Sequence, residues 1–114
     1  DFTQVINLDP THVDGYNNRA QVLINLGKYQ QAISDANRAI NLATDSYRAH
    51  FSRGLAHAMS GEYQQAIDDL TQAIAIYPEY AVAYYIRGLV YQELGERGES
   101  ARDSLKAMEL GYTP

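Results

Sequence analysis

Apolar and small residues recur three and four positions apart along this chain, which is the spacing of a helix with one buried face. Tyr16, Ala20 and Leu23 form one such series, and a second series follows through Ala32 and Ala36. Both series return twice more in the rest of the sequence. The pattern predicts helices at residues 13–26, 29–42, 47–60, 63–76, 81–94 and 97–110.

Two kinds of break separate these helices. Within each pair, a glycine stands where a left-handed C-cap is needed, and glycine adopts that conformation at little cost. Between pairs stand Asp9-Pro10, residues 43–45 and Tyr77-Pro78, and proline cannot continue a helix. The chain is therefore predicted to be all-α and built from helical hairpins.

The hairpins repeat with a period of 34 residues. The positions that share this interval are Gly27, Gly61 and Gly95; Arg19, Arg53 and Arg87; Asp35, Asp69 and Asp103; and Ala39, Ala73 and Ala107. Such a period indicates a stacked array in which each repeat buries its apolar face against its neighbours. An array of this kind presents an extended surface rather than an enclosed catalytic pocket.

The two ends of the chain differ from the repeats between them. Residues 1–10 match residues 69–78 at five of ten positions, so we interpret residues 1–12 as the end of a preceding repeat. Full repeats then occupy residues 13–46, 47–80 and 81–114 of a single domain, 1–114. Because the sequence opens at Asp1 inside this pattern, we expect a segment of a longer protein. The last helix is more polar, as suits a terminal helix, and Gly111 should end it.

Composition narrows the classes of function. The net charge is -5, with 46% hydrophobic residues and no run of Lys or Arg, which disfavours nucleic acid as a partner. Cysteine is absent, and neither a bilayer-length apolar stretch nor a catalytic motif is found. We predict a soluble, non-enzymatic chain without a cofactor or metal. The compartment stays open, with the cytoplasm slightly favoured.

The repeated residues resemble the signature of the tetratricopeptide repeat (TPR) family, whose period is also 34 residues. The first copy reads Tyr16, Ala20, Leu23, Gly27, Tyr29, Ala32, Ala36, Ala39; the second His50, Gly54, His57, Gly61, Tyr63, Ala66, Leu70, Ala73, Pro78; the third Tyr84, Gly88, Tyr91, Gly95, Ser100, Ser104, Ala107. Thr44 and Tyr112 replace the family's usual proline, and Arg97 replaces an aromatic residue. The resemblance implies a right-handed α-solenoid whose concave groove is lined mainly by the first helix of each pair.

Two ligand-binding patterns of that family are missing from this sequence. Members that bind chaperone C-terminal peptides hold the terminal carboxylate with a clamp of Lys, Asn and Arg. The matching positions here are Asn17, Gln21, Ser52, Val82 and Ile86. No cation of the clamp is present, which disfavours a terminal carboxylate. An asparagine ladder is interrupted as well, because Asn18 is followed in register by Ser52 and Ile86.

Each repeated arginine is followed 16 residues later by a repeated aspartate. A row of arginines could form a ladder for phosphate or acidic peptides. A hairpin with this spacing instead lets the arginine of the first helix reach the aspartate of the second. We interpret Arg19–Asp35, Arg53–Asp69 and Arg87–Asp103 as structural ion pairs, and we expect Arg53→Ala to lower the melting temperature.

His50 and His57 are the candidates for metal or general-base chemistry. Seven residues place them roughly 10 Å apart along a helix, which is too far for one metal ion. In the other repeats, the positions equivalent to His50 are occupied by Tyr16 and Tyr84. Those equivalent to His57 are occupied by Leu23 and Tyr91. We therefore interpret both histidines as packing residues.

The remaining face of the first helices is the predicted peptide-binding groove. Its residues are Asn17, Gln21, Ile24, Phe51, Leu55, Met59, Tyr85, Ile86 and Leu89. Exposed apolar side chains on a concave surface usually mark a partner site, although these residues could instead pack against neighbouring helices. We expect a scaffold that holds a peptide or helical segment of a partner protein, with Asn17 and Gln21 bonding to the partner backbone.

A structural role is the alternative function. If residues 1–8 are the second helix of an incomplete hairpin, they would invite another helix to complete it. The array would then self-associate as a homo-oligomer, or dock within its own larger protein.

Overall fold

The computed structural model describes residues 13–113. Within this range the chain is helical and contains no strand. The helices are α2 (Val13–Asn25), α3 (Tyr29–Leu42), α4 (Tyr47–Met59), α5 (Tyr63–Ile76), α6 (Ala81–Glu93) and α7 (Arg97–Glu109). Each predicted helix is confirmed to within one residue at either end. The part-repeat expected at residues 1–12, and the self-association surface assigned to it, lie outside the described residues.

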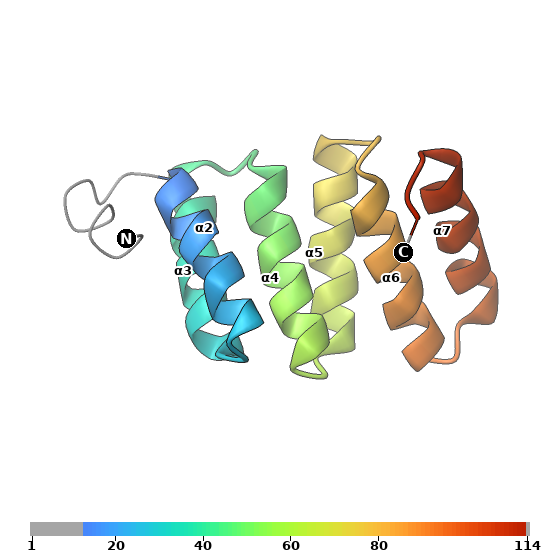
Figure 1. The fold of residues 1–114 in the computed structure, drawn as a ribbon, viewed down its shortest axis with the longest axis horizontal. Helices are drawn as coiled ribbons and strands as arrows, with labels where there is room; N and C mark the ends of the chain where they lie inside the picture. Colours follow the sequence, from blue (N-terminus) through green and yellow to red (C-terminus); the bar gives the residue numbers. More distant parts are fainter. Residues whose placement is uncertain (1–12, 114) are drawn as a thin grey trace.

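The helices form three hairpins that stand side by side in the order of the sequence (Figure 1). The hairpin partners α2 and α3, α4 and α5, and α6 and α7 pack closely. Neighbouring hairpins join through α3 against α4 and α5 against α6, and the first helices α2 and α4 also touch. This arrangement confirms the predicted all-α solenoid.

The turn inside each hairpin is set by a glycine in the left-handed region. The φ angles of Gly27, Gly61 and Gly95 are 77°, 81° and 79°. In the first of these turns the amide of Lys28 donates to the carbonyl oxygen of Leu23 at 2.8 Å, which is the long bond of a Schellman cap. Gly111, with φ 94°, ends α7 in the same way. A side chain at these positions would strain the backbone, so the turn glycines fix the hairpin period.

The largest cluster of buried apolar residues lies between α4, α5 and α6. It consists of Phe51, Ala66, Ile67, Leu70, Ala73, Ala83 and Val90. Leu70 is completely buried, and it lies against the glycine of the facing helix, since the Cβ of an alanine at Gly54 would stand 3.1 Å from Leu70 Cγ. The corresponding residues in the other repeats are the smaller Ala36 and Ser104. Of the three repeats, the second therefore has the largest side chain at this core position.

None of the helices described between residues 13 and 113 is both long and apolar enough to cross a membrane.

Candidate functional site

The structure brings each repeated arginine together with the aspartate 16 residues later. Arg19 donates two hydrogen bonds of 2.6 Å to Asp35, and Arg87 donates two of 2.8 Å to Asp103. These bonds raise the pKa of both guanidinium groups. Because each guanidinium already holds a buried carboxylate, the arginine column offers no open ladder for an anion.

In the second and third repeats the arginine also reaches the preceding repeat. Arg53 Nη1 donates to Asn37 Oδ1 at 2.9 Å, and Arg87 Nη1 donates to Thr71 Oγ1 at 3.1 Å. Each of these side chains thus joins three helices: its own, its hairpin partner and the second helix of the repeat before. The arginine therefore fixes the position of one repeat against the next as well as the hairpin itself.

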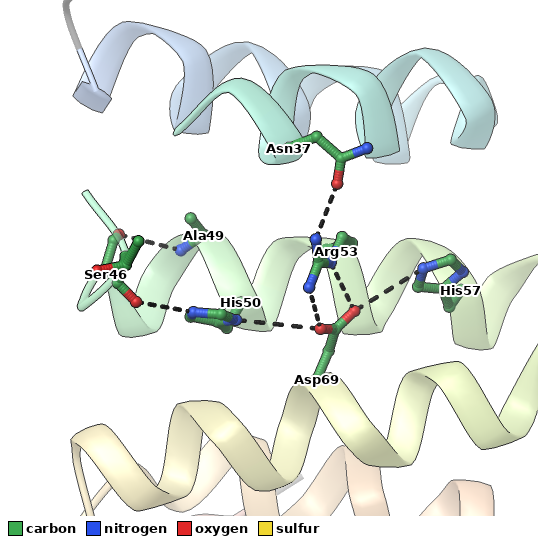
Figure 2. A network of polar contacts seen from close by, with 8 residues as sticks. Asn37, Ser46, Ala49, His50, Arg53, His57 and Asp69 are labelled. Atoms are coloured by element: carbon green, nitrogen blue, oxygen red, sulfur yellow. Dashed lines mark hydrogen bonds and ion pairs between the residues drawn. The ribbon is translucent and has the colours of Figure 1, made fainter. Parts of the chain in front are cut away.

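The aspartate of the second repeat stands at the centre of a wider polar network (Figure 2). Asp69 accepts bonds from Arg53 Nε at 2.9 Å and Nη2 at 2.7 Å. His50 Nδ1 lies 4.0 Å from Asp69 Oδ1, and His57 Nε2 lies 3.8 Å from Asp69 Oδ2. The packing role assigned to the two histidines missed this shared carboxylate. The sequence spacing could have indicated this contact, because positions 50, 53 and 57 lie three and four residues apart and so share one helix face.

The histidines differ in their remaining contacts. His50 Nε2 lies 3.0 Å from the carbonyl oxygen of Thr44, which identifies Nε2 as the donor nitrogen, while Nδ1 is buried without a hydrogen-bond partner in the described part of the chain. His57 Nδ1 lies 3.1 Å from Glu62 Oε1. Among residues 13–113, no group of three or more His, Cys, Asp or Glu side chains could hold a metal ion. The network joins α4 to α5 and, through the bond from Arg53 to Asn37, to α3.

The nine predicted groove residues lie on α2, α4 and α6 but differ widely in exposure. Asn17, Ile24 and Phe51 are buried, each with 6 or 7% of its surface exposed. Gln21, Leu55, Tyr85 and Ile86 are partly buried. Met59 and Leu89 are 54% and 41% exposed. Solvent therefore reaches the apolar part of this face mainly at the C-terminal ends of α4 and α6.

The polar residues on α2 are bonded within the array. Gln21 Nε2 donates to Ser52 Oγ at 2.7 Å, and Ser52 Oγ donates to Asn17 Oδ1 at 2.8 Å. Ser52 is completely buried. These bonds tie α2 to α4, a role of Ser52 that was not predicted from the sequence. They also occupy groups that had been expected to bond to a partner backbone.

Phe51 belongs to an aromatic cluster rather than to an open groove. Its ring centroid lies 5.1 Å from that of Tyr80, and Tyr80 in turn contacts Tyr47 and Tyr77 at 5.1 and 5.7 Å. Tyr80 stands in the loop between α5 and α6, so the inter-repeat loop covers Phe51. Burial raises the pKa of the Tyr80 phenol, with the nearby Tyr47 adding to the shift.

We expect this cluster to make stability fall at alkaline pH. The folded state keeps the Tyr80 proton to a higher pH than the unfolded chain, so this contribution is intact below the usual tyrosine pKa of about 10 and is lost as the pH rises above it. Urea unfolding between pH 8 and pH 11 should show a shallower decline for Tyr80→Phe than for wild type. Equal slopes in the two proteins would contradict this assignment.

Tyr85 meets a residue from the end of the chain. Its ring centroid lies 4.7 Å from that of Tyr112, in the segment that follows α7. Replacing Tyr85 would therefore also remove an intramolecular contact. Tyr85 is a less specific probe of the groove than its neighbours on α6.

The exposed apolar residues meet in a groove of ≈ 470 Å3 between α4 and α6. We call it the α4–α6 groove; its lining comprises Leu55, Ala58, Met59, Tyr63, Ile86, Leu89, Val90, Gln92 and Glu93. Four of these residues were predicted groove residues, while Tyr63 comes from the start of α5. The other predicted residues, Asn17, Gln21, Ile24, Phe51 and Tyr85, lie outside this lining.

Comparison with known proteins identifies a family and several similar folds. The tetratricopeptide repeat family model matches residues 17–81 and 60–109. The rice (Oryza sativa subsp. japonica) "Protein SGT1 homolog" is 40% identical over 55 residues, which are 48% of this chain and 15% of that protein. A crystal structure of MamA superposes with a TM-score of 0.88 at 32% identity, covering 96% of this chain and 64% of MamA. The chain thus spans only a small part of the rice protein and less than two thirds of MamA.

A further solved structure holds a ligand. The second TPR of Spaghetti (RPAP3), bound to the HSP90 peptide SRMEEVD, superposes with a TM-score of 0.83 at 26% identity. The match covers 86% of this chain and 91% of that one.

Proposed function

This chain belongs to the tetratricopeptide repeat family, and on that premise we propose that it is a non-enzymatic scaffold that binds a segment of a partner protein in the α4–α6 groove. The observation that carries the proposal is the exposure of Met59 and Leu89, 54% and 41%, beside the partly buried Leu55 and Ile86. When a partner covers apolar side chains that are open to water in a groove, the complex is stabilised by about 25 cal/mol per Å2 of apolar surface buried. A peptide or a helix face would supply that cover.

The similarity to the RPAP3 repeat domain supports a peptide ligand but not an identical one. That domain is solved with the HSP90 peptide SRMEEVD. Here the positions expected to hold a terminal carboxylate carry no cation, and Asn17, Gln21 and Ser52 bond to one another. We therefore centre the proposed site on α4 and α6, and the partner bonds expected of Asn17 and Gln21 are not part of it.

Removing the two exposed side chains should weaken partner binding. The double variant Met59→Ala, Leu89→Ala should bind about 10- to 100-fold more weakly, because each truncation removes roughly 1 kcal/mol of apolar contact. The partner would first be captured from a lysate of the source organism with wild-type protein and identified by mass spectrometry. Its affinity for both purified proteins would then be measured by titration calorimetry.

The chain offers a matched control for this experiment. Leu105 and Met108 on α7 are 57% and 67% exposed, so Leu105→Ala, Met108→Ala removes the same two side-chain types from another surface. This variant should keep its affinity within about twofold, and both variants should keep wild-type circular dichroism. Loss of binding in the α7 variant alone would refute the α4–α6 groove as the site.

A further inference from the structure

The charge around the α4–α6 groove narrows the chemistry of its ligand. Resting on the proposed function, we infer that the bound segment carries an apolar side chain with a lysine or arginine close to it in the sequence. The apolar side chain fills the groove, and the cation lies beside Glu93. This chemistry is opposite to that of an acidic C-terminal peptide.

The apolar half of the site has a buried floor and an open rim. Val90 is buried and Leu55 and Ile86 are partly buried, so they form a fixed floor. Met59 and Leu89 rise from α4 and α6 as the exposed rim. An unbranched methionine adapts to ligands of different shape, so the groove suits an aliphatic or aromatic residue without selecting one.

The polar edge of the groove is acidic. Glu93 is the one charged residue among the lining residues, and it lies next to Gln92 at the end of α6. Both side chains are exposed. In contrast, the nearest arginine on the same helix, Arg87, is bonded to Asp103 and lies outside the lining. Among the described residues that line the groove, a ligand therefore meets one carboxylate and no cation.

The net charge of the chain and two of its turns favour the same sign of ligand. The three part-buried Arg–Asp pairs are neutral as units, so the net charge of -5 comes from the other charged residues of the chain. The hairpin turn beside α4 carries Glu62, which His57 contacts through Nδ1. The turn after α6 carries Glu96, which is followed by Arg97 at the start of α7. Opposite charges attract across an interface, and like charges juxtaposed there are costly. An apolar segment with a basic residue satisfies both parts of the groove.

The test is a selection from a phage-displayed library of random dodecapeptides on immobilised wild-type protein. We expect the enriched peptides to combine an aliphatic or aromatic residue with a nearby Lys or Arg. Synthetic copies would be titrated by fluorescence anisotropy against wild type and the variants Leu89→Ala, Glu93→Gln and Glu93→Lys. Leu89→Ala should lower affinity about fivefold.

The charge variants separate this inference from the function on which it rests. Glu93→Lys should weaken binding roughly five- to tenfold and Glu93→Gln about two- to threefold, since the interaction is at an exposed rim. Glu109→Lys, an exposed glutamate at the end of α7, should bind as wild type does.

Three other outcomes would overturn the inference. Peptides that need Leu89 but are acidic, or that bind equally well to Glu93→Lys, would overturn the basic-ligand inference and leave the scaffold function standing. A selection that yields no peptide dependent on Leu89 would overturn both. Self-association that Leu89→Ala abolishes, with no enriched peptide, would assign the groove to a second copy of the chain and would also overturn the inference.

Discussion

Arg53→Ala should lower the free energy of unfolding by about 3 kcal/mol, one of the two largest effects expected in this protein. Asp69 is 6% exposed, and Arg53 supplies two hydrogen bonds to its carboxylate. Removing one partner of a buried pair leaves an uncompensated charge, which costs about 3–5 kcal/mol when burial is complete. We place the value at the lower end because the Arg53 side chain is 27% exposed. Thermal unfolding followed by circular dichroism would measure the change.

The chain contains a control of the same chemistry at the surface. Arg102 donates to Glu99 at 2.9 Å, but their side chains are 75% and 40% exposed. Arg102→Ala should therefore cost less than about 0.5 kcal/mol. If Arg53→Ala melts as wild type does but binds its partner less well, the arginine belongs to a binding site and our structural assignment is wrong.

A double-mutant cycle would show whether the stranded carboxylate is the cause. Asp69→Ala removes that charge, so the double variant Arg53→Ala, Asp69→Ala should be less destabilised than the sum of the single variants. The coupling should be about 1–3 kcal/mol, as for residues in one buried network. Strict additivity would mean that Arg53 stabilises the array through its other contacts, such as Asn37.

The second large effect concerns the close contact between Gly54 and Leu70. Leu70→Ala should lower the free energy of unfolding by about 3 kcal/mol, because truncating a completely buried leucine leaves a cavity that the helices cannot close. Gly54→Ala alone should cost roughly 1–2 kcal/mol, since its Cβ would lie 3.1 Å from Asp69 Cβ and Leu70 Cγ. The higher helix propensity of alanine offsets part of that strain.

Combining these two substitutions should cost less than their sum. The double variant Gly54→Ala, Leu70→Ala reproduces the pair Ala20 and Ala36 found at the same positions of the first repeat. In the alanine background, the added methyl group enters space that Leu70 has vacated. Urea unfolding of the four proteins would give the coupling, with Leu42→Ala as a control at a leucine that is 43% exposed. A Gly54→Ala change equally costly in both backgrounds would contradict the steric explanation.

The sequence predicted the helices well because their determinants are local and repeated. Glycine in the left-handed conformation at 27, 61 and 95 ends three helices, and each is followed at once by a series with helical spacing. Because the three repeats are in register, the same residues mark the equivalent helix boundary in each of them. The 16-residue separation of Arg and Asp likewise brings the two side chains together, because the hairpin between them has a fixed length.

The candidate site was predicted less completely. Helical spacing identified Leu55, Met59, Ile86 and Leu89, which do line one groove. It also selected Phe51 and Tyr85, whose exposure depends on Tyr80 in a loop and Tyr112 beyond the last helix. The helical periodicity of α4 or α6 contains no information about residues that arrive from another segment. For the same reason, the bonds of Ser52 to Asn17 and Gln21 were not foreseen.

The sequence by itself determined the all-α class, the hairpin period and the helix boundaries, because backbone conformation and helix periodicity are set by residues close together in the chain. Only the tertiary structure decided which side chains of that framework remain open to solvent. It placed two histidines around Asp69 and left Met59 and Leu89 exposed beside Glu93. These outcomes depend on how one repeat sits against the next, and that geometry arises from contacts between residues far apart in sequence.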